Sequence, residues 1–440
     1  MGQWTRLIKF NSRSDLYQYL KTKKVMIWGA RMTGLGALRQ LVSNKINVLN
    51  FIDSDPAFKK KKVHNLTVLH PKKLSEFKNK DNDNLVLLLA VSIKEEEIKQ
   101  QLKKIDLNNK IEIISFTDYK SPYYTVDILG SCNLKCISCP HSIKDTNVPK
   151  GSMKVNDFKK VFDKIIFDSP DITHLSLYSW GEPFMHPYLD EIINYVHSRN
   201  IAVALSSNLS IKFKNRIEKV LKTSPDYLKI SISGYYSKAY NNTHQGGDIE
   251  LVKENMKFIS DLINKNQYKT LVDINYHLYR DNCDENLNKI KNFADELGFI
   301  ISTTYSLVMP LERTISHLEG FTDKSTEKLQ ENLLVTIKEG IKASSKIPLP
   351  KNVCPFRENQ ININSDLTVP VCCTVWEREG NIVSNNYLES SINQINQNKK
   401  KIDLCNKCMK YNLPEYNMGF NRKGWDKFAK EKTILDKGNI

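Results

Sequence analysis

Three cysteines, Cys132, Cys136 and Cys139, follow one another at C-x3-C-x2-C spacing, and no fourth cysteine stands close to them in the sequence. Cysteine thiolates are the usual protein ligands of iron–sulfur clusters. So short a run can bind three irons of a cubane cluster and leave the fourth iron free to hold a small ligand. The main alternative is structural zinc, but zinc sites usually use four ligands in two pairs. The spacing therefore predicts a [4Fe–4S] cluster with one open iron.

The element that must position these cysteines precedes them. Residues 124–130, Tyr-Thr-Val-Asp-Ile-Leu-Gly, have the pattern of a buried strand, which places the cysteines in the loop after it. Their spacing resembles the signature of the radical S-adenosylmethionine (radical SAM) superfamily. The resemblance implies that the cluster binds SAM. Ser138 stands where the family usually has an aromatic residue, which weakens the expected contact with adenine.

Strand and helix patterns alternate through residues 121–310. Strands are expected at 125–130, 172–178, 201–206, 226–232, 270–278 and 299–306. Helices are expected between them at 154–167, 188–199, 212–222, 249–264 and 284–297. Six such units make a partial (β/α)6 barrel, and barrels of this type carry their chemistry at the carboxyl ends of the strands.

The second of these strands ends in Ser179, Trp180, Gly181 and Glu182, followed by a proline. This stretch resembles the Gly-Gly-Glu-Pro motif of radical SAM enzymes, with Trp180 in place of the first glycine. A carboxylate and backbone carbonyls at a strand end can hold an ammonium group. The resemblance therefore implies that these residues bind the methionine part of SAM.

Polar residues also follow the third and fourth strands. Ser207 and Asn208 suit a ribose, although a capping turn before the helix at 212 is the alternative. Ser231 and Ser233 follow from the fourth strand, and the family resemblance implies that one of them meets the SAM carboxylate or ribose.

A second group of cysteines lies between residues 351 and 425, around a hairpin-like stretch at 361–371. It resembles the SPASM/twitch extension of radical SAM enzymes, which carries auxiliary clusters. Five thiols are enough for one further [4Fe–4S] cluster, and tetrahedral zinc is the alternative. The expected ligands are Cys354, Cys372, Cys405 and Cys408, with Cys373 as the alternative to Cys372.

Residues 1–120 have strand patterns at 24–29, 47–52, 84–90 and 110–115 and helix patterns at 35–43 and 93–104, which predicts a small parallel sheet. The turn from Gly29 to Gly34 would place backbone N–H groups at a helix start, where a phosphate can bind. Asp53 lies where a ribose-binding acid is expected. The stretch resembles a Rossmann-like module of sugar-modifying enzymes and acyltransferases, although lysines at 59–62 interrupt it. The resemblance implies a nucleotide, nucleotide-sugar or CoA-type ligand, and a docking domain without a ligand is the alternative.

Composition limits the partners. The chain has 440 residues and 40% hydrophobic content, and it contains no apolar run of about 18 residues that could span a membrane. The N-terminus lacks a secretory signal, so we expect a cytoplasmic protein whose nine cysteines serve mainly metal binding.

The net charge of +16 is spread over scattered lysines, which makes nucleic acid an unlikely partner. Such a surface would steer an acidic electron donor, a flavodoxin or a ferredoxin.

The predicted fold is therefore of the α/β class, with five segments. These are a Rossmann-like domain (1–120), a radical SAM partial barrel (121–310), a helical connector with a helix near 325–343 (311–350), a SPASM/twitch-like domain (351–425) and a tail (426–440).

The resemblance implies that the protein cleaves SAM reductively to a 5′-deoxyadenosyl radical. That radical would abstract hydrogen from a carbohydrate or nucleotide-linked small molecule, in a dehydrogenation or an epimerisation. One alternative is a maturase of a ribosomal peptide or protein, and another is a non-catalytic iron–sulfur relay. If the enzyme epimerises, Cys283 is the candidate hydrogen donor, because it follows the fifth strand; a packing cysteine is the alternative.

Overall fold

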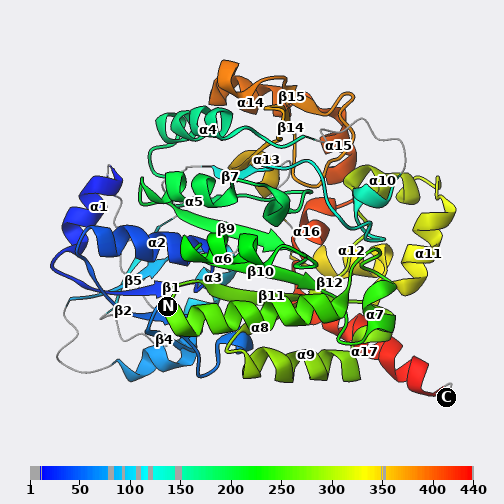
Figure 1. The fold of residues 1–440 in the computed structure, drawn as a ribbon, viewed down its shortest axis with the longest axis horizontal. Helices are drawn as coiled ribbons and strands as arrows, with labels where there is room; N and C mark the ends of the chain where they lie inside the picture. The colour runs from blue at the N-terminus through cyan, green and yellow to red at the C-terminus, as the bar shows by residue number, and fades with distance from the viewer. Residues whose placement is uncertain are drawn as a thin grey trace.

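The structure, a computed structural model, describes residues 10, 12–77, 84–91, 95–105, 111–116, 122–143, 151–347, 349 and 353–438. The described residues form two large sheets of mainly parallel strands and, in the C-terminal region, a third sheet of two strands. Figure 1 shows the N-terminal sheet in blue beside the green strands and helices of the second sheet. Among the described residues, no helix is both long and apolar enough to cross a membrane.

The N-terminal sheet has six strands in the order β3-β4-β2-β1-β5-β6. They are β1 (Lys24–Trp28), β2 (Asn47–Ile52), β3 (Lys62–Val63), β4 (Leu66–Leu69), β5 (Leu85–Leu89) and β6 (Glu112–Ser115), with helices α1 (Arg13–Leu20), α2 (Met32–Ser43) and α3 (Glu95–Leu102). The four predicted strands pair in parallel. The predicted elements extend to residues 93, 94 and 110, which lie outside the described part. Sequence patterns missed α1 and the β3–β4 hairpin, whose turn residues His64 and Asn65 have φ values of 48° and 67°.

The second sheet has seven strands in the order β12-β11-β10-β9-β8-β7-β13, and all neighbours are parallel. They are β7 (Tyr123–Val126), β8 (His174–Ser176), β9 (Ala202–Ser207), β10 (Tyr227–Ile232), β11 (Leu271–Leu278), β12 (Ile300–Tyr305) and β13 (Gln360–Ile363). Strands β7 to β12 are the six predicted ones. The fold is thus of the α/β class with parallel sheets, consistent with an incomplete barrel.

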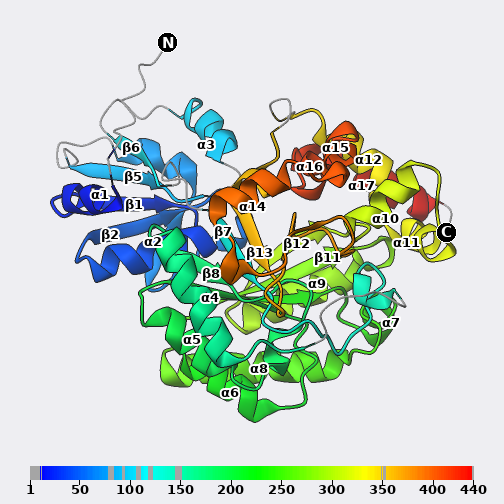
Figure 2. The same ribbon diagram turned by 90° about the horizontal axis from the view of Figure 1, so that it is seen from above.

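The seventh strand, β13, comes from the C-terminal cysteine region and pairs in parallel with β7 (Figure 2). We predicted a hairpin over 361–371, but this prediction is wrong in its pairing, because β14 (Val369–Pro370) pairs with β15 (Ile382–Ser384). The physical reason lies in Ile361 and Ile363, which bury their side chains in the barrel core beside β7.

Helices cover the outer face of the second sheet as predicted: α4 (Val155–Asp168), α5 (Leu189–His197), α6 (Lys214–Lys222), α8 (Ile249–Asn266) and α9 (Glu285–Glu296). Each turns an apolar stripe to the strands. In α4 the stripe contains Phe158, Val161, Phe162 and Ile165. Burying a side chain of this size contributes roughly 1.5–3 kcal/mol, so these stripes fix the helices that carry the strand-end loops.

The connector differs from the prediction of one helix near 325–343. It contains α10 (Leu311–Leu318), α11 (Lys324–Asn332) and α12 (Ile337–Ser344). The break before α12 arises because Thr336 begins a new helix through a capping box with Glu339. Of the predicted tail, 426–440, residues 426–438 belong to helix α17 (Arg422–Gly438), and 439–440 lie outside the described residues. Trp425 of α17 packs against Gly340, where any Cβ would lie 2.5 Å from its ring.

The N-terminal sheet is attached to the barrel through helix α2. Gly36 lies so close to β8 that a Cβ there would be 2.6 Å from Thr173 O. Arg39 forms an ion pair with buried Asp226 at 3.0 Å. Arg31, at the start of α2, pairs with buried Asp273 of β11 at 2.8 Å. A charge at depth needs such a partner, so α2 is fixed against the amino-terminal part of the barrel, away from the strand-end loops.

Candidate active site

The three cysteines lie in the loop after β7, at the carboxyl end of the barrel strands, and all three are half-buried. Backbone hydrogen bonds hold this loop: Lys135 N donates to Gln245 O at 2.9 Å and Ile137 N to Thr243 O at 3.1 Å. Arg313 of α10 donates to Ile137 O at 3.1 Å. The glycine-containing loop at 242–248 is thus one of the supports of the cysteine loop.

The surroundings of the three thiols disfavour free thiolates. Burial, with the neighbouring Glu182 carboxylate, raises the pKa of Cys132 to about 12. Burial raises the pKa of Cys139 to about 11, and it holds the pKa of Cys136 well above its usual value. A bound metal reverses this preference, since a coordinating thiol is deprotonated. The thiols are therefore suited to metal ligation rather than to nucleophilic chemistry.

Glu182 links the second and third strand ends to the cysteine loop. Its side chain is 2% exposed. One carboxylate oxygen accepts from Phe184 N at 3.1 Å and the other from Asn208 N at 2.8 Å, while Glu182 N donates to Ser131 O at 2.9 Å. Burial raises the pKa of Glu182 to about 7. The Ser207 side chain also hydrogen-bonds to this carboxylate. A carboxylate has about four acceptor sites, so Glu182 positions the loops and can still accept a further donor.

Two neighbours of Glu182 explain how the loop reaches this position. A Cβ at Gly181 would lie 1.5 Å from Leu129 O, so only glycine permits this approach. Asp127 accepts from Trp180 N at 3.2 Å and from Gly181 N at 3.3 Å, and burial raises its pKa to about 6. The sequence pattern missed Asp127, whose only signal was an acidic residue inside a predicted buried strand.

Asn208 brings the third strand end to the cysteines. Its Nδ2 lies 3.5 Å from Cys132 Sγ and donates to Asn133 Oδ1 at 3.0 Å. Ser207 Oγ accepts from Leu209 N at 2.9 Å. This turn does not cap the helix that follows, because α6 begins at Lys214. The structure thus places the Asn208 amide at the cysteine site and uses the Ser207 hydroxyl within the turn.

The two serines of the fourth strand end lie in different environments. Ser233 is fully buried, and its hydroxyl bonds with His244 Nδ1 at 2.6 Å and with the Thr243 hydroxyl. Its hydrogen bonds hold the loop that supports the cysteines. Ser231 is half-buried, so of the two it is the one with an accessible side chain.

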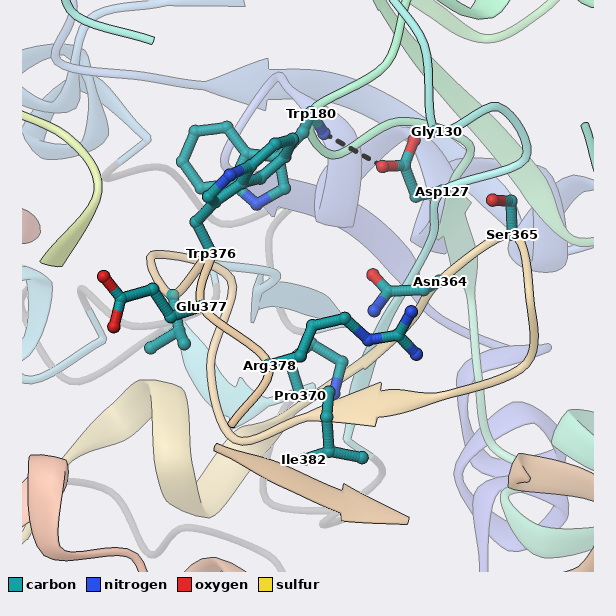
Figure 3. Close-up of a pocket in the computed structure, with 11 residues that line it drawn as sticks. Asp127, Gly130, Trp180, Asn364, Ser365, Pro370, Trp376, Glu377, Arg378 and Ile382 are labelled. Atoms are coloured by element: carbon teal, nitrogen blue, oxygen red, sulfur yellow. Dashed lines mark hydrogen bonds between the residues drawn. The ribbon is translucent and has the colours of Figure 1, made fainter. Parts of the chain in front are cut away.

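Trp180, which replaces a glycine of the family motif, contacts the C-terminal region. Its ring packs edge-on against Trp376 with 5.8 Å between centroids, and His141 packs against the same Trp376 at 5.0 Å. Figure 3 shows these tryptophans beside a small cavity whose other walls include Asp127 and Arg378. Trp180 therefore joins the barrel mouth to the C-terminal region.

The four predicted auxiliary ligands converge. Cys354, Cys372, Cys405 and Cys408 line one cavity of about 20 Å³, to which Cys373 does not contribute. Cys354 precedes α13 (Pro355–Asn359), and α15 (Asp403–Lys410) carries the last two cysteines. A hydrogen bond from Cys373 lowers the pKa of Cys372 to about 6, and burial raises that of Cys405 to about 12. Among the described residues, no three His, Cys, Asp or Glu side chains form a compact site for a single ion.

The donor set and a buried cation fit an anionic cluster here. Lys399, at the end of α14 (Ile392–Lys399), is 1% exposed, donates to Arg357 O beside the cavity, and interacts electrostatically with three of these cysteines. A buried ammonium is costly without a negative partner. Four thiolates around a [4Fe–4S] cluster would provide that negative charge.

A large cleft of about 1030 Å³ lies at the carboxyl ends of β1 and β2, and the barrel edge at β12 and helix α17 form its other wall. Gly29 (φ 108°) lines it, and a Cβ at Gly34 would lie 1.8 Å from Gly29 O. Asp53 also lines it, but its carboxylate accepts from Ala30 N at 3.0 Å and from Asp55 N at 2.9 Å. Asp53 thus holds the glycine turn, and α2 presents its start to the cleft.

Cys283 lies directly before α9, half-buried, with Sγ 3.5 Å from Arg280 O. A neighbour that the sequence did not single out reaches the cysteine loop: the Tyr279 hydroxyl donates to Ser138 Oγ at 3.2 Å. Tyr279 is buried. An aromatic side chain from directly after β11 thus lies beside the position where the family usually carries one in the loop itself.

Two family models match the chain. The Radical SAM superfamily model matches residues 126–294, and the model named C2185-like, N-terminal matches residues 21–121. The region that carries the three cysteines therefore matches the domain of the Radical SAM superfamily.

Particular relatives share short segments with it. Fe-coproporphyrin III synthase of Methanosarcina barkeri (strain Fusaro / DSM 804) is 26% identical over 123 residues, 28% of this chain and 30% of the relative. The antilisterial bacteriocin subtilosin biosynthesis protein AlbA of Bacillus subtilis (strain 168) is 31% identical over 109 residues, 25% of this chain and 23% of the relative. The chain spans less than a third of either relative.

Among solved structures, anSMEcpe with bound AdoMet and Cp18Cys peptide is 13% identical with a TM-score of 0.43, covering 72% of this chain and 100% of that one. Streptococcus suis SuiB bound to S-adenosylmethionine is 13% identical with a TM-score of 0.44, covering 69% of this chain and 71% of that one.

Proposed function

We propose that this protein is a radical SAM enzyme that cleaves SAM reductively and abstracts hydrogen from a carbohydrate or nucleotide-linked small molecule. The observation that carries the proposal is the convergence of the cysteine loop, Glu182 and Asn208 at the carboxyl end of the barrel. These side chains come from three strand ends that are far apart in the sequence, yet direct hydrogen bonds join them.

The residues have distinct roles in this proposal. When bound, a [4Fe–4S] cluster and SAM supply the electron-transfer and radical chemistry. Cys132, Cys136 and Cys139 would hold the cluster. Glu182 fixes the loop and offers its remaining lone pairs to the methionine ammonium, and Asn208 offers an amide next to Cys132. Ser179, Trp180, Gly181, Ser207, Ser231 and Ser233 remain the other predicted SAM-binding residues.

An auxiliary cluster held by Cys354, Cys372, Cys405 and Cys408 would give the enzyme a second redox centre. Their shared cavity and the buried charge of Lys399 support this assignment. A second centre suits dehydrogenation, which needs an electron acceptor, more than epimerisation, which needs a hydrogen donor. In an epimerase that donor would be Cys283. The first electron would come from a flavodoxin or ferredoxin, which the net charge of +16 would attract.

The N-terminal cleft supports a nucleotide-bearing ligand. Its volume of about 1030 Å³ and the glycine turn at the start of α2 are the features that such a ligand uses. Because Asp53 is engaged by the turn, its role in this proposal is to shape the phosphate site rather than to meet a ribose directly. Isothermal calorimetry of the full chain with nucleotide-sugars, dinucleotides and CoA tests this; no binding at millimolar concentration would leave a docking role.

A second candidate is a peptide maturase. The matched segment of AlbA, whose name states a role in subtilosin biosynthesis, favours it, whereas the matched synthase from Methanosarcina is named for a small-molecule product. The two matches therefore point to different substrate classes, and the nucleotide-binding result above would separate them.

The decisive test is anaerobic reconstitution with iron, sulfide, a strong reductant and SAM, followed by chromatography for 5′-deoxyadenosine. We expect its formation by the wild-type chain. Absence of 5′-deoxyadenosine from a protein that has bound the expected iron would overturn the proposal and favour a non-catalytic relay.

A further inference from the structure

Lys399 carries a positive charge in the interior of the C-terminal region. Its Nζ donates to Arg357 O at 3.2 Å and to Gln360 O at shorter range. Both acceptors are backbone carbonyls, which satisfy the donors but do not neutralise a full charge. Such a group is costly in a protein interior unless an anion lies nearby.

The ionisable groups that face Lys399 come from three elements. They are the thiols of Cys372, Cys354 and Cys405 and the carboxylate of Glu358. Glu358 is shared with Arg357, with which it forms an ion pair at 3.0 Å. Burial lowers the pKa of Lys399 to about 8, and the Cys372 thiolate opposes that effect. The cysteines are thus the groups whose ionisation would balance this ammonium.

The cavity between these cysteines also has apolar walls, among them Leu311, Phe356, Val371 and Met409. Water is largely excluded from such a space, so a charge acts there with little screening. The potential of an iron–sulfur cluster depends on nearby charge, hydrogen bonds and exposure. Arg357 lines this cavity, and Lys399 lies behind it, with its Nζ on the Arg357 carbonyl. A fixed cation so close to the cavity therefore influences any cluster that the four cysteines hold.

We propose that the Lys399 ammonium is the built-in counter-charge of the auxiliary cluster and raises its reduction potential. This inference rests on the auxiliary cluster of the proposed function. Four thiolates on a [4Fe–4S]²⁺ core carry a net charge of −2, and addition of one electron makes it −3. The cation stabilises the more negative state more strongly, so it makes the cluster a better acceptor of one electron.

Lys399 is a positioning residue, because it would act through the cluster and not on the substrate. Its test uses the full chain with Cys132, Cys136 and Cys139 all replaced by alanine, so that only the auxiliary cluster contributes. Three variants are compared in this background: Lys399→Met removes the charge, Lys399→Arg keeps it, and Lys400→Met changes the exposed neighbour as a control. The measurement is the midpoint potential from a redox titration followed by electron paramagnetic resonance, together with iron content.

We expect Lys399→Met to shift the midpoint to a more negative potential, while Lys399→Arg and Lys400→Met stay near the parent. An unchanged midpoint in Lys399→Met with full iron would overturn the inference and leave the cluster assignment intact. Iron missing from the parent itself, or zinc in its place, would overturn the auxiliary cluster and with it this inference.

If Lys399→Met fails to fold, Lys399→Gln replaces it, because an amide can still donate to a backbone carbonyl while carrying no charge. Loss of the cluster from both neutral variants but not from Lys399→Arg supports a counter-charge. Loss of the cluster from Lys399→Met, Lys399→Gln and Lys399→Arg alike would show that the charge of residue 399 does not hold the cluster, and it would overturn the inference.

Discussion

The two cysteine groups differ in how they are built and in the charges around them. Cys132, Cys136 and Cys139 come from one short loop on the barrel mouth, and Glu182 and Asp127 beside them are buried acids. The auxiliary cysteines come from segments up to 54 residues apart, from 354 to 408, line one cavity, and interact electrostatically with the buried Lys399.

This difference suggests a division of labour. Three ligands in one loop leave an iron open to a substrate-like ligand, whereas four ligands saturate a cluster that can only exchange electrons. Acidic neighbours disfavour added negative charge, and a buried cation favours it. We therefore expect the auxiliary cluster to have the higher potential of the two, as an electron acceptor needs.

The largest effect is expected from removing the three cysteines of the barrel loop. The wild-type chain should bind about eight irons, and replacement of Cys132, Cys136 and Cys139 by alanine should leave about four and abolish 5′-deoxyadenosine formation. Cys283→Ala, outside both groups, is the control and should keep about eight. Colorimetric iron analysis and chromatography measure both quantities. Continued SAM cleavage by the triple variant would contradict the assignment.

Removal of one auxiliary ligand should separate the two centres. Cys372→Ala should lose the auxiliary iron, about four atoms per chain, while 5′-deoxyadenosine still forms. Cys373→Ala, the neighbouring change, should keep the iron, because Cys373 does not line the cavity. Iron analysis with electron paramagnetic resonance distinguishes them. If Cys373→Ala loses the iron and Cys372→Ala keeps it, Cys373 is the ligand instead of Cys372. Equal iron in both variants would show that neither cysteine binds the metal.

Glu182→Ala tests the link between strand ends. It leaves the N–H groups of Phe184 and Asn208 buried without their acceptor, which should cost on the order of 3 kcal/mol of unfolding free energy. Loss of SAM cleavage should accompany it. Urea unfolding and the 5′-deoxyadenosine assay measure these effects. Glu191→Ala, an exposed change on α5, should stay within about 0.5 kcal/mol of wild type; similar losses in both variants would remove the special role of Glu182.

The smallest expected effect concerns pH in the metal-free chain. Burial raises the pKa of Asp127 to about 6, so the native state holds this proton at pH values where the unfolded state has released it. Stability therefore falls as pH rises from about 4 through about 6. Between pH 4.5 and pH 7, the stability of Asp127→Asn should fall less than that of wild type. Urea unfolding midpoints measure this fall, and an identical fall in both proteins would show that the Asp127 carboxyl does not contribute.

Local patterns predicted most of this molecule. The six barrel strands and their helices could be predicted because apolar periodicity is a local property of the sequence. Cys132, Cys136, Cys139 and Glu182 could be singled out because their motifs are local too. Asp127 did not, since one acid in a buried strand looks the same whether it is structural or functional. Lys399 looked like one of many scattered lysines, because only tertiary packing brings it beside cysteines 354, 372 and 405.

Long-range pairing was the other source of error. The hairpin expected at 361–371 turns at Asn364–Thr368, but β13 joins β7, more than 200 residues away, and β14 pairs with β15 instead. The helix expected near 325–343 failed for the opposite reason: a local capping box at Thr336 interrupts an otherwise continuous pattern. The boundary expected at 425/426 falls inside helix α17, whose Trp425 is buried against Gly340 of α12.

The pairing of β13 with β7 also has a consequence for biosynthesis. During translation β7 is made early, but the strand that covers its outer edge is not complete until residue 363. Until then the nascent barrel presents an unpaired edge, which is a template for association with other chains. Contacts of such sequence separation form slowly. A chain that stopped at residue 350 would keep this edge exposed. Such a truncated chain should therefore aggregate through the free edge of β7 and depend more on chaperones than the full chain.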